Sequence, residues 1–368
     1  MEILKTDWFD PENEDFDLTM EDLEKNKSFL KEQRELGNPN YQYKGNCTKK
    51  FAEKICDKYF DREWEWVKNH DLPESTEFPT TDKMMENEIK TLVKEQKSFK
   101  TRSPIIKKFH PSALKASREG HLSPFDGWKH LQEDKDAFRK FMLNRLRCSD
   151  FFNEHKKGKE DYKAHWSLLL ESKIPPFIYC IGLTTSGKYM NVSMFKPHCA
   201  RYLVKKYLNN YSEVFDPFSG VSGRLLGVVA CNKKYIGRDL SQTVINESIE
   251  LMKFASPVFS KCGINPDYDM KQGDVTQNTG KYQCLLTCSP YGGKHGGIER
   301  WDGVPDSNNS CDDWIDICLK NYECDRYVFV TDDNIQKYKP YVKEELQNTC
   351  HWGSNKEYVV VIDKMCYS

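Results

Sequence analysis

The fold is decided by the stretch VFDPFSGVSGRLLG, residues 214–227. A short apolar strand, 214–215, runs into 216–218, and a turn that contains Gly220 and Gly223 then leads into a helix. Glycines at such a turn let the backbone approach a ligand closely and adopt conformations that other residues avoid. The N-terminus of the following helix can bind polar ligand groups. The stretch therefore predicts a ligand-binding turn at the carboxyl end of a strand.

Strand and helix patterns alternate on both sides of this turn. Candidate strands lie at Val214–Phe215, Tyr235–Gly237, 273–274 (the end of a third strand), Tyr282–Thr287, Tyr327–Thr331 and Tyr358–Ile362. Candidate helices lie at 197–208, 223–231, 241–255, 311–321 and 334–347. This alternation predicts an α/β class with a mostly parallel, Rossmann-like sheet and helices on both faces. Ligands bind such sheets at the carboxyl ends of the strands.

The chain before the Pro175–Pro176 pair has a different residue pattern. It is charged and mainly helical in pattern, with 128–170 as a helical stretch, which predicts a separate region over 1–170 and a sheet domain over 171–368. Net charge is −1, so that any nucleic-acid surface must come from local clustering. The 14 cysteines form no CxxC pair or zinc spacing and predict thiols in a reducing compartment. Without a signal peptide or a long apolar run, we expect an intracellular protein, in the cytoplasm or with the genome, and no membrane partner.

Two acidic residues follow the next two strands. Asp239 ends the strand in YIGRDLS, and Asp274 follows Gly273 in KQGDV. An acid at the end of the second strand is placed to accept hydrogen bonds from two ribose hydroxyls.

The order DPFxGxxGR, YIGxD, GD resembles motifs I, II and III of the class I S-adenosylmethionine-dependent methyltransferases. The resemblance implies that S-adenosylmethionine is the cofactor and lies over Asp216, Pro217, Phe218, Gly220 and Gly223. It implies that Asp239 binds the ribose and that Asp274 lies beside the adenine. A glycine turn of a dinucleotide enzyme is the alternative, but the spacing is not GxGxxG.

The segment NVSMFKPHC, residues 191–199, precedes this motif. A similar segment packs over the methionine end of the cofactor in the amino-methyltransferases of DNA, and Asn191, Ser193, Phe195 and Pro197 are the matching positions. An amphipathic core helix is the alternative.

The run CLLT leads into Cys288, Ser289, Pro290 and Tyr291. It resembles motif IV, (D/N/S)PP(Y/F), of the DNA amino-methyltransferases, in which a side-chain oxygen and a proline carbonyl accept the hydrogens of an exocyclic amine. The amine lone pair then points at the methyl group, and close positioning supplies much of the rate. One proline is missing here, so the polar position is Ser289 in one register and Cys288 in the other, and both stay open. The resemblance favours methylation of N6-adenine or N4-cytosine in DNA, with no metal required.

Two other hypotheses stay open. Thr287-Cys288-Ser289 also matches the TCS string of RNA methyltransferases that attack a pyrimidine ring with a thiolate, which needs an exposed cysteine with a lowered pKa. A buried, inert thiol is the alternative for Cys288. From another class of protein, a non-catalytic nucleic-acid-binding protein that retains the fold would explain the irregular tetrad.

Basic residues gather in two places. Residues 94–118 hold eight Lys/Arg against one Glu, and the loop GGKHGGIERWDG follows the tetrad. Phosphate contacts give most of the non-specific affinity for nucleic acid, and a base must flip out to be modified. The partner predicted is DNA, with RNA possible. The candidate contacts are Lys107, Lys108, Arg118, Lys294 and Arg300; a solvated charged face is the alternative.

Overall fold

The chain divides into two compact units. One contains residues 1–73 and 127–182, and the other contains 74–126 and 183–368. In the computed structural model, the described residues are 49–72, 81–94, 103–118, 122–147, 156–157, 160–161, 194–288, 290, 299–300, 309–331, 335–347, 350 and 356–364. Residues 74–126, which we expected in the N-terminal region, thus cluster with the sheet rather than with the helices around them.

The first unit is mainly helical where it is described. Its helices are α2 (Lys49–Lys68), most of α5 (Pro124–Glu133) and α6 (Lys135–Arg147). Phe138, Phe141 and Met142 lie buried on one face of α6, as their helical spacing predicts. The indole of Trp128 donates a 2.8 Å hydrogen bond to the carbonyl of His70, which fixes α5 against the end of α2. The expected helical stretch 128–170 is interrupted by a short antiparallel pair, β2 (Lys156–Lys157) and β3 (Glu160–Asp161).

The second unit is built on a seven-stranded sheet in the order β12-β13-β11-β8-β4-β5-β6. Neighbouring strands pair in parallel except at β13, which is antiparallel to both of its neighbours. The strands are β4 (Glu213–Asp216), β5 (Lys234–Asp239), β6 (Tyr268–Gln272), β8 (Cys284–Cys288), β11 (Arg326–Thr331), β12 (Val342–Gln347) and β13 (Lys356–Asp363). Two smaller pairs are β1 (Ser117–Arg118) with β9 (Glu299–Arg300), and β7 (Gly280–Lys281) with β10 (Tyr322–Glu323).

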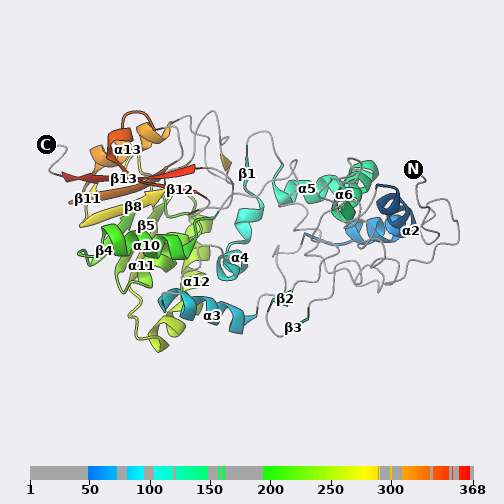
Figure 1. Cartoon of the computed structure of the whole chain (residues 1–368), viewed down its shortest axis with the longest axis horizontal. Helices are drawn as coiled ribbons and strands as arrows, with labels where there is room; N and C mark the ends of the chain where they lie inside the picture. The colour runs from blue at the N-terminus through cyan, green and yellow to red at the C-terminus, as the bar shows by residue number, and fades with distance from the viewer. Residues whose placement is uncertain are drawn as a thin grey trace, which may run out of the picture. The chain divides into compact units, whose positions relative to one another are not determined.

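Helices cover both faces of this sheet, as Figure 1 shows. Alternate residues along a strand enter different cores: Val214 packs with the helices of one face, and Phe215 with those of the other. The first face holds α3 (Asp82–Val93), α4 (Pro104–Phe109), α10 (Pro197–Tyr207), α11 (Gly223–Val229) and α12 (Gln242–Lys261). The second holds α13 (Cys311–Asn321). This mostly parallel sheet, covered on both faces, is the Rossmann-like α/β architecture that the sequence predicted.

The helix expected over 334–347 is wrong. The structure has a 3₁₀ turn, η3 (Lys339–Tyr341), followed by the edge strand β12. Pro340 interrupts any helix at this point because it lacks the amide hydrogen that a helix interior needs. Beyond it, the side chains of Val342, Glu344 and Leu346 are half-buried while Lys343 and Glu345 are exposed, the period of two that a half-buried strand shows. Pairing with β13 therefore overrides the helical propensity of the Lys-Glu-Glu-Leu run.

Two smaller expectations also need correction. Helix α12 continues past residue 255 to Lys261 with Pro257 inside it. Cys199 and Cys350 form a disulfide, so the expectation that all cysteines are thiols is wrong for this pair. Within the described ranges, the structure contains no helix that is long and apolar enough to cross a membrane.

Candidate functional site

The turn between β4 and α11 lies where two neighbouring strands end. β4 and β5 pair in register, so the residues after Asp216 face those at the end of β5. The amide of Gly220 donates a 2.9 Å hydrogen bond to Oδ2 of Asp239, and the amide of Ser219 donates a 2.8 Å bond to the carbonyl of Arg238. Gly220 has a φ of 53°, in the left-handed region that favours glycine. An added Cβ would meet nothing nearer than 3.8 Å, so it is the backbone conformation and not crowding that calls for glycine.

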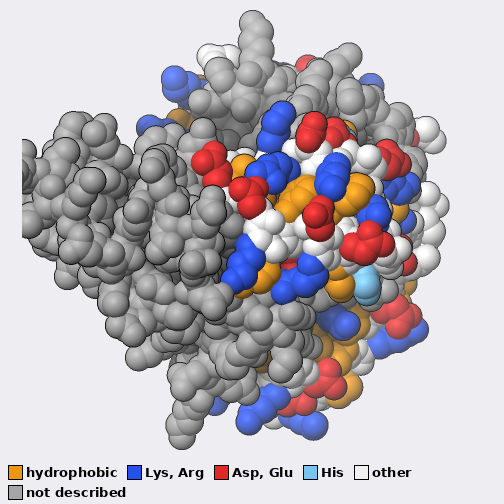
Figure 2. Space-filling view, turned by 90° about the vertical axis from the view of Figure 1, so that its right-hand side faces the viewer, with side chains coloured by type: hydrophobic (Ala, Val, Ile, Leu, Met, Phe, Trp, Pro, Cys, Tyr) orange, Lys and Arg blue, Asp and Glu red, His pale blue; other side chains and the backbone are white. Residues whose placement is uncertain are grey.

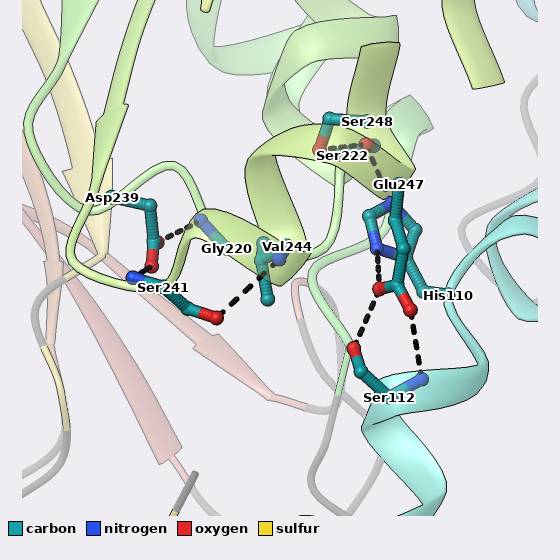
Figure 3. Close-up of polar contacts among 9 residues, drawn as sticks. All are labelled: His110, Ser112, Gly220, Ser222, Asp239, Ser241, Val244, Glu247 and Ser248. Atoms are coloured by element: carbon teal, nitrogen blue, oxygen red, sulfur yellow. Dashed lines mark hydrogen bonds and ion pairs between the residues drawn. The ribbon is translucent and has the colours of Figure 1, made fainter. Parts of the chain in front are cut away.

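Within the described residues, Asp239 keeps acceptor capacity that no hydrogen bond uses. Its Oδ1 accepts a 3.0 Å hydrogen bond from the amide of Ser241, and Oδ2 accepts the bond from Gly220, as Figure 3 shows. An ionised carboxylate offers about four lone-pair positions, so about two remain. Burial raises the pKa of this carboxyl. Ser241 also caps α12 through a 3.4 Å bond from the amide of Val244, which fixes the backbone beside the acid.

Asp216 is an interior hub. Its side chain has zero exposure and accepts hydrogen bonds from Arg224 (2.6 Å), Tyr235 (2.7 Å), Thr287 (2.6 Å) and the amide of Phe218 (3.2 Å). These donors come from α11, β5, β8 and the turn itself. Burial alone would lower the pKa of Arg224, but the charge of the Asp216 carboxylate holds that pKa above its usual value. The structure thus directs the Asp216 carboxylate at protein groups, and this carboxylate links β4 to β5 and β8.

Gly223 lies against backbone. A Cβ there would come within 1.9 Å of the carbonyl oxygen of Phe195, so glycine allows the lead-in to α10 to touch the start of α11. Phe195 itself is buried, with the guanidinium of Arg224 5.0 Å from its ring centroid. Pro197 is the first residue of α10 and is buried as well. The lead-in to α10 therefore packs directly against the start of α11, next to the glycine turn.

The remaining predicted cofactor residues lie around the same edge of the sheet. Pro217 is buried, and the half-buried ring of Phe218 packs edge-on against Trp314 of α13 at 5.1 Å. Asp274 follows β6, and its Oδ1 accepts bonds from the amide (2.8 Å) and hydroxyl (2.7 Å) of Thr276. Asn191 and Ser193 lie outside the described residues.

The catalytic tetrad begins at the end of β8, the neighbour of β4. Phe215 pairs with Leu285, which brings the end of β8 to the same sheet edge as the glycine turn. Cys288 is the last residue of β8, is 8% exposed and is not in a disulfide. Pro290 is exposed. Ser289 and Tyr291 lie outside the described residues.

The predicted basic contacts are only partly described. Lys107 and Lys108 lie on α4, the first half-buried and the second exposed. Arg118 and Arg300 are described by their backbones, and Lys294 lies outside the described residues. The strand pair β1·β9, with Ser117 opposite Arg300, joins the segment 103–118 to the chain that follows the tetrad.

A polar network behind the turn was missed by sequence reasoning. Nε2 of His110 lies 2.7 Å from Oγ of Ser222, and Nδ1 lies 3.0 Å from Oε2 of Glu247. Ser222 donates a 2.8 Å bond to Ser248, and Ser112 binds both oxygens of Glu247. Figure 3 shows these side chains converging from α12, the glycine turn and the segment around His110. A histidine next to a proline in a basic run was the one available signal, and nothing marked Glu247.

Comparison with known proteins adds little to this geometry. No family model and no curated protein matches the chain. Solved structures that are similar include three proteins. M. capricolum TrmK in complex with S-adenosylhomocysteine has 12% identity, and the match covers 45% of this chain and 67% of that protein, with a TM-score of 0.31. An S-adenosylmethionine-dependent methyltransferase from Agrobacterium tumefaciens has 12% identity, 48% and 65% coverage, and a TM-score of 0.31. Haemophilus influenzae TehB has 10% identity, 45% and 67% coverage, and a TM-score of 0.29. Scores this low say nothing about function, and the fold assignment follows from the strand order of the chain itself.

Proposed function

We propose that this protein transfers a methyl group from S-adenosylmethionine to an exocyclic amine of a DNA base, N6 of adenine or N4 of cytosine. The observation that carries the proposal is the pairing of Gly220 with Asp239 across the ends of two adjacent parallel strands, where the described residues leave about two acceptor positions of Asp239 for a ligand. Such a carboxylate can accept hydrogen bonds from both hydroxyls of a vicinal diol, such as that of a ribose.

The residues around the turn fit the cofactor. Oγ of Ser219 is buried and has no hydrogen-bond partner within the described residues, an uncommon state that a polar ligand group would relieve. Asp239 would bind the ribose hydroxyls, the 219–223 turn would lie under the cofactor, and Asp274 would lie beside the adenine. When bound, S-adenosylmethionine supplies an electrophilic methyl group. In the described ranges, no three His, Cys, Asp or Glu side chains gather as a metal site, and the proposed reaction needs none.

The tetrad supports an amine as the acceptor. Pro290 is exposed directly beyond β8, where its carbonyl could accept a hydrogen of the amine while Tyr291 stacks on the base. Cys288 ends a buried strand and is 8% exposed, which disfavours the thiolate attack of pyrimidine C5 enzymes because that step needs an accessible sulfur. The amine mechanism therefore has more support than the cysteine mechanism.

DNA as the partner rests on α4 and on the strand pair that follows it. The two α4 lysines, 107 and 108, belong to the same compact unit as the glycine turn, and the β1·β9 pair joins their segment to the chain after the tetrad. The face drawn in Figure 2 carries Lys and Arg interspersed with Asp and Glu, so that face offers no described surface of one sign. We propose that the phosphate contacts lie on the 103–118 segment.

The test is transfer of a labelled methyl group from S-adenosylmethionine to DNA, to RNA or to neither. Mass spectrometry of the digested product identifies the atom: N6-methyladenine or N4-methylcytosine supports the proposal. 5-Methylcytosine or 5-methyluridine, or a covalent complex with 5-fluorocytosine that is lost in Cys288→Ala, replaces it with the cysteine mechanism. Binding of nucleic acid without any transfer indicates a non-catalytic protein that retains the fold.

A further inference from the structure

The side chain of His110 bridges two parts of the second unit that are far apart in sequence. It is 1% exposed, and its two ring nitrogens contact Ser222 of the glycine turn and Glu247 of α12. We infer that His110, oriented by Glu247, is a positioning residue that holds Ser222 and thereby sets the glycine turn for S-adenosylmethionine. This inference rests on the proposed function and names a residue that acts on the cofactor site through Ser222, without touching the cofactor.

The order Ser222, His110, Glu247 resembles that of a serine nucleophile with its base and orienting acid. That chemistry does not apply here. Ser222 is 1% exposed, and its hydroxyl donates to Ser248, so that a substrate has no access to its oxygen. A buried hydroxyl between a histidine and a second serine is instead suited to fixing a backbone position.

Ser222 needs such support because of its conformation. Its φ is 64°, in the left-handed region, and this residue carries a side chain. A non-glycine residue persists there when its surroundings hold it. The carbonyl of Ser222 accepts the first bond of α11, from Leu226, and its amide donates a 3.0 Å bond to the carbonyl of Gly220. A change at Ser222 therefore passes directly to Gly220 and to the start of the helix.

The segment that carries His110 is itself anchored. Ile105, Ile106 and Ala113 are buried in the same core as α10, α11 and α12. Glu247, 14% exposed, accepts a 3.0 Å bond from the amide of Ser112 and a 2.5 Å bond from its hydroxyl. One carboxylate thus orients the imidazole and fixes the backbone two residues further on. The turn is braced by a core-anchored segment rather than by a mobile side chain.

The experiment measures binding of S-adenosylmethionine and of S-adenosylhomocysteine to the full chain by calorimetry, with thermal melting in parallel. We expect His110→Ala to weaken binding about tenfold or more, the effect of releasing one strained residue in the site. His110→Gln, which can still donate toward Oγ of Ser222, should recover most of the affinity. Glu247→Gln should weaken binding less than His110→Ala does.

A double-mutant cycle separates positioning from a loss of core packing. Glycine adopts the left-handed conformation without strain, so in a Ser222→Gly background we expect His110→Ala to change the affinity by less than about twofold. Ser310→Ala is the matched control. It removes the capping box of α13, on the other face of the sheet, and should lower the melting temperature without changing cofactor affinity.

The outcomes are distinct. If the wild-type protein binds neither S-adenosylmethionine nor its product, the proposed function falls, and this inference falls with it. If the wild type binds but His110→Ala binds equally well, or if His110→Ala costs the same in both backgrounds, the positioning role is overturned while the proposed function stands. Should His110→Ala not fold, the affinities of His110→Gln and Glu247→Gln relative to Ser310→Ala decide the matter. Wild-type affinity in both overturns the inference.

Discussion

The amide of Gly220 and the carboxylate of Asp239 are joined by a 2.9 Å hydrogen bond across the ends of β4 and β5. This bond aligns the glycine turn with the acid. Together with the bond from the amide of Ser241, it uses two of about four acceptor positions of the carboxylate, so the described residues leave about two for a ligand.

Replacement of Asp239 should weaken cofactor binding. Asp239→Ala removes a charged acceptor from the ribose hydroxyls and releases the amide of Gly220. A hydrogen bond to a charged group contributes about 1.5–3 kcal/mol, so we expect a roughly ten- to hundredfold loss of S-adenosylmethionine affinity by calorimetry. Asp363→Asn is the control, because Asp363 pairs with Arg326 where β11 begins, at the opposite edge of the sheet. Wild-type affinity in Asp239→Ala would remove the motif assignment.

Cofactor affinity should rise with pH through the titration of Asp239. Burial raises the pKa of this carboxyl above its ordinary value of 3.8, and hydroxyl donors favour the ionised form. Binding therefore releases a proton, and affinity falls as the pH drops below the raised pKa. The ligand-free fold behaves oppositely: the contribution of Asp239 to stability is present below 3.8 and is lost as the pH rises through the raised pKa. Calorimetry across this pH range checks that cofactor affinity rises with pH. Asp239→Asn should make the affinity nearly independent of pH, and an unchanged pH dependence in that variant would mean that another group titrates.

Breaking the interior ion pair should destabilise the second unit. Arg224→Met leaves the buried Asp216 carboxylate without its cationic partner, and we expect a loss of about 3–5 kcal/mol in the free energy of unfolding by urea. Thr287→Val removes one neutral donor from the same carboxylate and should cost about 1–3 kcal/mol. Equal losses in the two variants would mean that the charge of Arg224 contributes nothing beyond a hydrogen bond.

The α4 lysines should affect nucleic acid and not cofactor. Charge reversal at Lys107 and Lys108 should weaken DNA binding and reduce the slope of log affinity against log salt by about 2, because each lysine that neutralises a phosphate releases about one counterion. Affinity for S-adenosylmethionine should stay the same. The matched control is charge reversal at Lys261 and Lys281, which lie at the end of α12 and just before β8, at the opposite edge of the sheet. An intact salt slope in the α4 variant would identify it as a solvated face.

Tyr291 and Cys288 should respond differently to truncation. Base–aromatic stacking is worth about 1–3 kcal/mol, so Tyr291→Ala should lose most methyl transfer while keeping its cofactor affinity. Cys288→Ala should retain transfer, because an amine attacks the methyl group without covalent help. Abolished turnover in Cys288→Ala, with cofactor binding intact, would favour the C5 mechanism instead.

The parts of this protein that local patterns predicted are those with local causes. The helix 311–321 has the bounds that the sequence predicted, and it begins at Cys311 because Ser310 and Asp313 form a capping box there. The strands that end at Asp216 and Asp239 were found from short apolar runs, although β4 is longer by one residue at each end and β5 by one residue at its start and two at its end. The edge strand β12 was missed because its partner, β13, stabilises it from outside its own sequence.

The candidate site divides in the same way. The glycine turn and the acids after β5 and β6 could be placed from their motifs, since parallel strands bring their carboxyl ends to one edge. The direction in which each side chain points could not be predicted from these motifs. The place of Asp216 under the cofactor stays a prediction, but its carboxylate accepts hydrogen bonds from Arg224 and Thr287 in the interior, because a buried charge is stable only when it is paired and hydrogen-bonded.

By itself, the sequence determined a glycine-rich turn after an apolar strand, an alternation of strands and helices, and the order of three motifs, because each is written in neighbouring residues. The tertiary structure alone decided that residues 74–126 join the sheet unit and that His110 reaches Ser222, 112 positions away. Such contacts form when the apolar residues around them, among them Ile106 and Ala113, are buried in a shared core. Burial in that core is a property of the whole fold, and no local pattern around His110 encodes which hydroxyl or carboxylate it will meet.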